Sequence, residues 1–232
     1  MYLKQLRKYH SGKSEQMKCF NALLFDMDGV IVDTELLFWK STYSVIRKRK
    51  LPLTYEDFVK KTIIQGVSVF SGLNFTDSQL EELCAERDRY YMESLKTHDI
   101  LNPYVFELLN GLSKKDIKLG IGTSSWKMYA DIIMERFGLS KYFDGIITRD
   151  DVENIKPSPD IYLKLAKRLE VGPSEALVIE DSDKGVMAAG NGKFQVLVLM
   201  NPYYSKFYRY EGAAGLFRDV KELEKYLSDI LS

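Results

Sequence analysis

Short apolar runs recur along the chain, and each has the length of a strand that is buried in a sheet. The five runs are residues 22–25, 119–122, 145–148, 176–179 and 196–199. Apolar residues also recur at helical spacing within residues 162–169, where Ser158 is the expected N-cap and Pro159 the first helical residue. Strands that alternate with helices predict an α/β fold: a doubly wound parallel sheet with a Rossmann-like core.

The interval between the first two runs is about three times what a single crossover helix needs. Its composition is helical, and Thr76 with Gln79 has the spacing of a capping box at a helix start. We therefore expect an inserted helical cap domain at residues 35–101. The α/β core domain would then consist of residues 19–34 and 102–232.

Charge and composition limit the partners of this chain. Lysine plus arginine equal aspartate plus glutamate at 33 each, so no net field would recruit nucleic acid or an anionic membrane. Residues 1–18 form a basic N-terminal extension, native or added, without the apolar run of a signal peptide or membrane anchor. Cys19 and Cys84 are interpreted as packing residues in a reducing compartment. We expect a cytoplasmic protein whose partners are small molecules.

Polar residues follow three of the apolar runs directly: Asp26, Thr123 and the pair Glu180 and Asp181. In an open α/β sheet, ligands bind at the carboxyl ends of the strands. Any strand has to end in something polar, so one such residue would mean little. Three together predict that these side chains share a site.

The first of these positions carries two carboxylates. Asp26 and Asp28 are two residues apart on an extended backbone, so their side chains point the same way, and Gly29 permits a sharp turn after them. Two converging carboxylates repel each other unless a cation lies between them. Oxygen ligands favour Mg²⁺, and Glu180 and Asp181 would complete the metal site.

These residue types suit a reaction on phosphate. When a carboxylate approaches a phosphate dianion, each charge pair costs roughly 4 kcal/mol at about 4 Å and an effective dielectric of about 20, so the total is roughly 8 kcal/mol. Mg²⁺ would supply two compensating charges and Lys156 a third. The Thr123 hydroxyl and the backbone N–H groups of Ser124 and Ser125 would bind the remaining oxygens.

Four motifs appear in a fixed order along the chain. They are Asp26-x-Asp28-Gly-Val-x-x-Asp-Thr-Glu35, Gly-Thr123-Ser-Ser, Lys156-Pro-Ser-Pro-Asp-Ile-Tyr and Glu180-Asp181-Ser-x-x-Gly-Val-x-Ala-Ala. In this order they resemble the motifs of the haloacid dehalogenase superfamily, and the resemblance covers nearly everything after Cys19. It is strongest to the branch with a helical cap between the first and second motifs, which includes β-phosphoglucomutase-like and phosphoglycolate phosphatase-like enzymes.

The resemblance implies a phosphoric monoester hydrolase that works through an aspartyl-phosphate intermediate. Asp26 would attack phosphorus, and Asp28 would protonate the leaving alkoxide and later deprotonate the attacking water. Thr123, Ser124 and Lys156 would bind the phosphoryl oxygens. The implied ligands of the Mg²⁺ cofactor are the Asp26 carboxylate, the Asp28 main-chain carbonyl and Asp181, with Glu180 near the ion directly or through water.

Two other functions remain open. A sugar-phosphate mutase of the β-phosphoglucomutase type uses the same core. The mutases that this chain resembles carry a His early in the first cap helix, and a Lys and an Arg that flank a Gly-Val-Ser turn. This chain has Phe38 at the first place, and Gln65 and Val69 around the turn. A receiver-like phospho-signalling module lacks both a cap and an acid two residues after its phosphorylated Asp. Hydrolysis is therefore the preferred interpretation.

The expected substrate is a small phosphorylated metabolite, such as a sugar phosphate or a phosphoglycolate-like acid. Cap residues would select it, and the predicted specificity residues are Gln65, Gly66, Val67 and Ser68. We expect a monomer, because a cap that seals its own site removes one reason to dimerise. Asp33 is interpreted as a helix cap, and the basic run 47–50 as a solvated helix end that favours the helix dipole.

Overall fold

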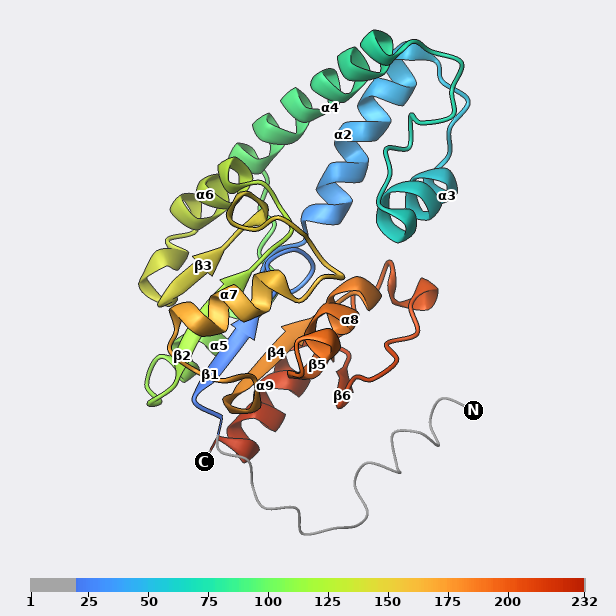
Figure 1. Cartoon of the computed structure of the whole chain (residues 1–232). Helices are drawn as coiled ribbons and strands as arrows, with labels where there is room; N and C mark the ends of the chain where they lie inside the picture. The colour runs from blue at the N-terminus through green and yellow to red at the C-terminus, as the bar shows by residue number, and fades with distance from the viewer. Residues whose placement is uncertain (1–19, 232) are drawn as a thin grey trace.

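A computed structural model describes residues 20–231 (Figure 1), so the predicted extension 1–18 and Cys19 lie outside the described residues. Within that range the strands form a six-stranded parallel sheet in the order β3-β2-β1-β4-β5-β6. The strands are β1 (Ala22–Phe25), β2 (Lys118–Gly122), β3 (Gly145–Ile147), β4 (Ala176–Glu180), β5 (Gln195–Leu199) and β6 (Gly215–Phe217). The five predicted strands are present, and β6 is an addition that the apolar runs did not indicate.

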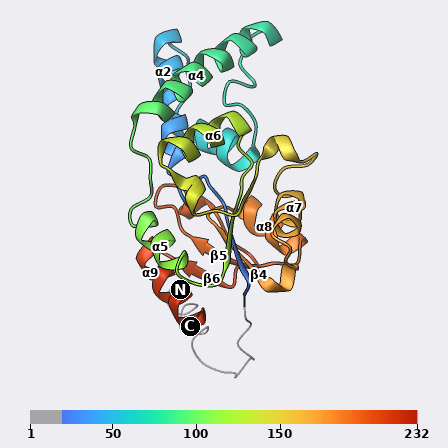
Figure 2. The ribbon, with the colours of Figure 1, turned by 90° about the vertical axis from the view of Figure 1, so that its left-hand side faces the viewer.

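Helices cover both faces of the sheet (Figure 1, Figure 2). They are α5 (Val105–Leu112), α6 (Lys127–Arg136) and α9 (Val220–Ile230) on one face, and α7 (Asp160–Arg168) and α8 (Asp183–Asn191) on the other, with short 3₁₀ turns η2 (Leu139–Lys141), η3 (Arg149–Asp151), η4 (Pro173–Glu175) and η5 (Ser205–Phe207). Leu23 and Phe25 of β1 pack with α5, α6 and α9, whereas Ala22 and Leu24 pack with α7 and α8. The predicted doubly wound α/β fold is confirmed.

Between β1 and β2 the chain forms a helical insertion. Its elements are α2 (Thr34–Arg49), α3 (Tyr55–Phe58), the π-helix η1 (Val59–Gln65) and α4 (Asp77–Thr97). Figure 1 shows them beyond the carboxyl ends of the strands. Asn102 ties the exit of the insertion to its entry, because its side-chain amide donates to the carbonyls of Gly29 (2.9 Å) and Val30 (2.8 Å). The division into two domains at residues 35–101 stays a prediction.

The insertion has its own apolar cluster. Val45 of α2, Phe58 of α3 and Leu83 of α4 are buried together, and Tyr204 from the segment after β5 packs among them. Because Tyr204 belongs to the core, this cluster also joins the insertion to the sheet. No helix of the described residues is both long and apolar enough to cross a membrane.

Side chains begin several helices as the sequence predicts. The Asp33 carboxylate accepts a hydrogen bond from the Leu36 backbone N–H (3.5 Å) at the start of α2. At the start of α4, Thr76 Oγ1 accepts from the Gln79 N–H (3.3 Å) while Gln79 Oε1 accepts from the Thr76 N–H (2.9 Å). The Asp33 cap and the capping box are therefore confirmed.

Helix α7 begins one residue later than predicted. Pro159 occupies the N-cap position, and the first helical residue is Asp160. The predicted cap, Ser158, instead donates its hydroxyl to Asp160 Oδ1 (2.6 Å). No side chain caps the backbone at the start of α7, so the assignment of Ser158 as the N-cap was wrong.

The basic run at the end of α2 is solvated and also pairs with α4. Lys48 Nζ lies 2.5 Å from Glu86 Oε1, and Arg49 Nη2 lies 2.9 Å from Glu86 Oε2. Glu86 belongs to α4, and only 2% of its surface is exposed. A buried carboxylate needs such partners. The side chains of Lys48 and Arg49 stay 59% and 40% exposed at the end of the helix, so the solvated interpretation holds, and their pairing with Glu86 is an addition to it.

Replacing Glu86 by Gln should lower the free energy of unfolding by about 1–3 kcal/mol near pH 7, because the variant loses a buried charge-assisted contact between α2 and α4. The hydrogen bond from Lys48 lowers the pKa of Glu86. The contribution of this carboxylate is thus fully present above its unfolded-state pKa and is lost as the pH falls through the lower folded-state pKa. Chemical denaturation of wild type and variant at several pH values measures this.

The matched control for this experiment is Glu82→Gln, which removes a carboxylate from the same helix that also pairs with Arg49 but is 64% exposed. We expect a change below about 1 kcal/mol there, as for exposed ion pairs in general. Equal losses in the two variants, at every pH, would contradict the role assigned to Glu86.

Candidate active site

A tight turn after β1 positions the two carboxylates of the first motif. The Asp26 N–H donates to the Ile179 carbonyl of β4 (2.9 Å), and the residue Asp26 as a whole is 6% exposed. Gly29 closes the turn with a φ of +85°, and a Cβ built on it would lie 1.9 Å from Asp181 Oδ2. Only glycine combines this backbone conformation with so close an approach of the carboxylate.

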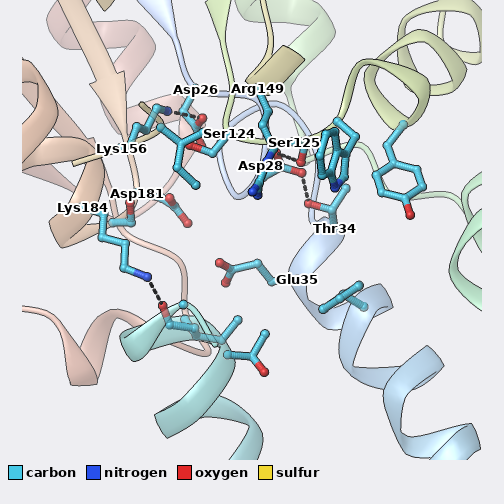
Figure 3. Close-up of a pocket in the computed structure, with 18 of the residues that line it drawn as sticks. Asp26, Asp28, Thr34, Glu35, Ser124, Ser125, Arg149, Lys156, Asp181 and Lys184 are labelled. Carbon is cyan, nitrogen blue, oxygen red and sulfur yellow. Dashed lines mark hydrogen bonds and ion pairs between the residues drawn. The ribbon is translucent and has the colours of Figure 1, made fainter. Parts of the chain in front are cut away.

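Lys156 lies at the centre of the buried part of the site (Figure 3). Its ammonium donates to Asp26 Oδ1 (2.5 Å) and to Glu180 Oε1 (2.7 Å), and all three side chains are buried. Glu180 also accepts from the Tyr162 hydroxyl (2.6 Å) and, through Oε2, from the Asp181 N–H (3.0 Å). Although burial alone would raise it, Lys156 and these hydrogen bonds hold the pKa of Glu180 below its usual range.

Asp28 has a different set of partners. The hydroxyl of Thr34 donates to Oδ1, and the hydroxyls of Thr123 and Ser125 donate to Oδ2 at 2.8 Å each. The predicted phosphate ligands Thr123 and Ser124 thus lie directly beside the two aspartates. Ser124 Oγ is buried without a partner among the described residues, which leaves its hydroxyl available to a bound group.

The acidic residues of the site fit a hard divalent cation. One carboxylate oxygen from each of Asp26, Glu180 and Asp181 lies within 4.8 Å of the other two. Asp181 Oδ2 is buried and has no hydrogen-bond partner among the described residues. Burial raises the pKa of Asp26 and of Asp181, so the single ammonium of Lys156 does not compensate their charges. Both oxygens of Glu180 already accept protein donors, so Asp26 and Asp181 are the better ligands.

A cavity of about 390 Å³ opens beside these residues, a volume that suits a small metabolite. The insertion supplies one wall, and the sheet supplies the other. Of the four predicted specificity residues only Gly66 lines this cavity. Val67 is 46% exposed, and Ser68 Oγ lies 3.7 Å from Cys84 Sγ. Gly66 follows η1 with a φ of +75°, and Gln65, the last residue of η1, does not line the cavity either.

A family model of the haloacid dehalogenase-like hydrolases matches residues 23–199, which include all four motifs. The chain belongs to the haloacid dehalogenase-like hydrolases. The predicted family and fold are confirmed, and homology places the chain among the phosphoric monoester hydrolases. The receiver-like alternative is not supported.

Similar proteins include both phosphatases and mutases. A phosphorylated carbohydrates phosphatase of Thermotoga maritima is 38% identical over 178 residues, which cover 72% of this chain and 79% of the relative. A β-phosphoglucomutase of Bacillus subtilis is 30% identical over 178 residues, covering 72% and 77%. Among solved structures, a putative β-phosphoglucomutase from Thermotoga maritima has a TM-score of 0.74 and 30% identity, covering 91% of this chain and all of that one.

The cavity of this hydrolase contains charged residues that sequence reasoning missed. Glu35 and Lys184 extend into it from α2 and α8, and the Arg149 guanidinium stacks on the ring of Trp126 at 4.4 Å. Glu35 stands within the first motif and Lys184 within the fourth, so their proximity to the site was available as a signal. Nothing in the sequence marks Arg149, which lies on the turn after β3.

The close approach of α8 to Glu180 generates a test of this geometry. A Cβ on Gly185 would lie 1.8 Å from the Glu180 carboxyl, so Gly185→Ala should displace Glu180 and lower the free energy of unfolding by about 1–3 kcal/mol. A Cβ on Gly190, in the same helix, would meet no atom within 4 Å. Gly190→Ala should therefore raise stability by up to about 1 kcal/mol. Thermal denaturation of both variants measures these two changes in stability. Changes of the same sign in both variants would contradict the close packing of Gly185 against Glu180.

Proposed function

We propose that this chain is a Mg²⁺-dependent phosphatase that hydrolyses a small phosphorylated metabolite through an aspartyl-phosphate formed on Asp26. The observation that carries the proposal is the unequal environment of the two aspartates. Asp26 lies against an ammonium group, whereas Asp28 is held by hydroxyls. A nucleophile has to be an anion, while an acid/base group has to exchange protons, so the two environments support two different roles.

In the first step an oxygen of Asp26 forms a bond to phosphorus, and the bond from phosphorus to the alkoxide oxygen of the substrate breaks. Asp28 gives its proton to that leaving oxygen. In the second step a water molecule attacks the phosphorus of the aspartyl-phosphate and Asp28 takes the proton from it. The bond between Asp26 and phosphorus breaks, so inorganic phosphate leaves and both carboxylates return to their starting forms.

The remaining side chains would hold the transferred group. Lys156, already at the Asp26 carboxylate, would contact a phosphoryl oxygen, and the Ser124 hydroxyl, which has no partner among the described residues, would donate to another. Thr123 would donate to the phosphoryl group by turning its single hydroxyl proton away from Asp28. Asp26, Asp181 and the Asp28 main-chain carbonyl would hold Mg²⁺, which supplies positive charge against the repulsion between carboxylate and phosphate. Glu180 would act on Lys156 and on the loop after β4, since the protein occupies both its oxygens.

The helical insertion is proposed to act as the cap of this site. Phe38, Ile63 and Gly66 from the insertion line the same cavity as Asp26 and Asp28 from the core. Movement of the insertion would therefore admit substrate, and closure would exclude bulk water and strengthen the electrostatic interactions.

Hydrolysis is favoured over phosphate return to the sugar. The similarity to a phosphorylated carbohydrates phosphatase supports a sugar phosphate or related metabolite as substrate. Phe38 lies against the ring of Tyr91, with ring centroids 5.1 Å apart, at the place where the resembled mutases carry a histidine. The phenyl ring of Phe38, unlike the imidazole of histidine, has no N–H or O–H proton to donate there. Incubation with sugar monophosphates, scored for free phosphate and for isomerised product, separates the two reactions.

Replacing Asp26 by Asn should lower kcat by at least about 1000-fold with any phosphate ester, because the amide cannot form the covalent intermediate. The variant should remain folded, because Lys156 keeps its buried ion pair with Glu180 when Asp26 loses its charge. The control is Asp116→Asn at an exposed position remote from the cavity, which should leave turnover unchanged. Turnover by the Asp26 variant close to that of wild type would rule out this nucleophile.

Mg²⁺ should stabilise the folded protein in proportion to its occupancy. At a hundredfold excess over the dissociation constant, the expected gain in unfolding free energy is about 2.7 kcal/mol. Asp181→Asn should reduce this gain, because it removes the buried oxygen that has no protein partner. Denaturation in the presence of Mg²⁺ and in the presence of a chelator measures this gain for wild type and for Asp181→Asn. An identical gain in both would remove Asp181 from the metal site.

A further inference from the structure

Glu35 and Lys184 face the same space from opposite walls of the cavity (Figure 3). Glu35 lies in the first turn of α2, in the insertion, and Lys184 lies in the first turn of α8, in the core. Among the ion pairs of the described residues, none joins these two side chains within 4.0 Å. An acidic and a basic side chain thus line one space without closing on each other.

Glu35 has a buried oxygen without a partner, and Lys184, which is half-buried, has few acceptors. Glu35 Oε2 is buried with no hydrogen-bond partner among the described residues. Burial, with the charges of Asp28 and Asp26 adding to it, raises the pKa of Glu35 to about 8. The Lys184 ammonium carries three donors, and within the described part of the chain one acceptor is present, the Ile63 carbonyl at 3.2 Å. Burial lowers the pKa of Lys184, as expected for a cation that is short of acceptors.

The metal does not account for Glu35. The carboxylates whose oxygens gather within 4.8 Å are those of Asp26, Glu180 and Asp181, and Glu35 is not among them. A buried, unsatisfied carboxyl is costly, so a ligand in the cavity is the natural source of its partner. An alcohol oxygen can donate to the Glu35 carboxylate and accept from Lys184 at the same time, whereas a phosphate dianion has no proton to donate and an alkyl group neither donates nor accepts.

We propose that Glu35 and Lys184 bind a hydroxyl group of the substrate between them, so that the enzyme selects phosphate monoesters of polyols or sugars. This inference rests on the proposed function, because the phosphate of the same molecule has to lie at Asp26. The same cavity reaches from Asp26 to both residues, so one small molecule spans the two places. Since Glu35 comes from the insertion and Lys184 from the core, binding of the hydroxyl also links the two parts of the protein.

The test compares two pairs of substrates that differ only in their hydroxyls: ribitol 5-phosphate with pentyl phosphate, and sorbitol 6-phosphate with hexyl phosphate. Steady-state kinetics with Mg²⁺ give kcat/KM for each. Wild type should prefer at least one polyol phosphate over its alkyl counterpart by about 10-fold or more. Glu35→Gln and Lys184→Met should each remove most of that preference, because each loses a charge-assisted hydrogen bond, which is worth about 10-fold to 100-fold.

The double variant sharpens the test. If one hydroxyl bridges both residues, the double variant should lose little more preference than either single variant. Matched controls are Glu81→Gln and Lys96→Met, exposed positions on α4 away from the cavity, which should keep the wild-type preference. Independent, fully additive losses would overturn the shared hydroxyl.

The outcomes also separate this inference from the proposed function. Wild type that releases phosphate from none of the four esters, nor from phenyl phosphate, would contradict the phosphatase itself. Wild type that hydrolyses all four esters equally well would leave the phosphatase standing and overturn the hydroxyl site. A polyol preference that both Glu35→Gln and Lys184→Met retain in full would likewise overturn the assignment of these residues.

Discussion

The contact of the Lys156 ammonium with Asp26 and Glu180 is the constraint on which the rest of the site depends. A buried ammonium is tolerated only where carboxylates compensate it, and two buried carboxylates at neighbouring strand ends are tolerated only with a cation between them. Asp26 follows β1 and Glu180 ends β4, so the three charges fix how the ends of these adjacent strands meet. Tyr162 and the backbone after β4 bind Glu180 further and hold Lys156 in place.

The core and the insertion contribute different kinds of side chain to the site. The sheet and its loops carry the groups suited to phosphate chemistry, all held by hydrogen bonds to one another or by burial. The insertion contributes side chains of a different kind, such as Phe38, Ile63 and Glu35, which line the same cavity. Relatives of this chain carry the names of phosphatases and of mutases. Such a difference is expected where one set of residues is suited to phosphate chemistry and a separate part of the protein lines the rest of the cavity.

Much of the fold and site was predictable, because apolar runs followed directly by polar residues reveal buried strands and what lies at their ends. Strand β6 was missed, although β3, which was found, is equally short. The partners of Lys48 and Arg49 could not be found either, because Glu86 lies 38 and 37 residues away on another helix. Sequence spacing also could not show that both oxygens of Glu180 accept hydrogen bonds from the protein. Nor could it show that the neighbours of Gly66 lie outside the cavity lining. These facts depend on three-dimensional packing.

The central claim is that a phosphoryl group passes through a covalent bond to Asp26. Rapid acid quenching during turnover with Mg²⁺ and a phosphate ester, followed by peptide mass spectrometry, tests it most directly. The account predicts that the peptide containing Asp26 carries one phosphoryl group in the early milliseconds to seconds and loses it once substrate is exhausted. A phosphoryl group found on another residue, or turnover with no covalent phosphoryl group at any time point, would contradict it.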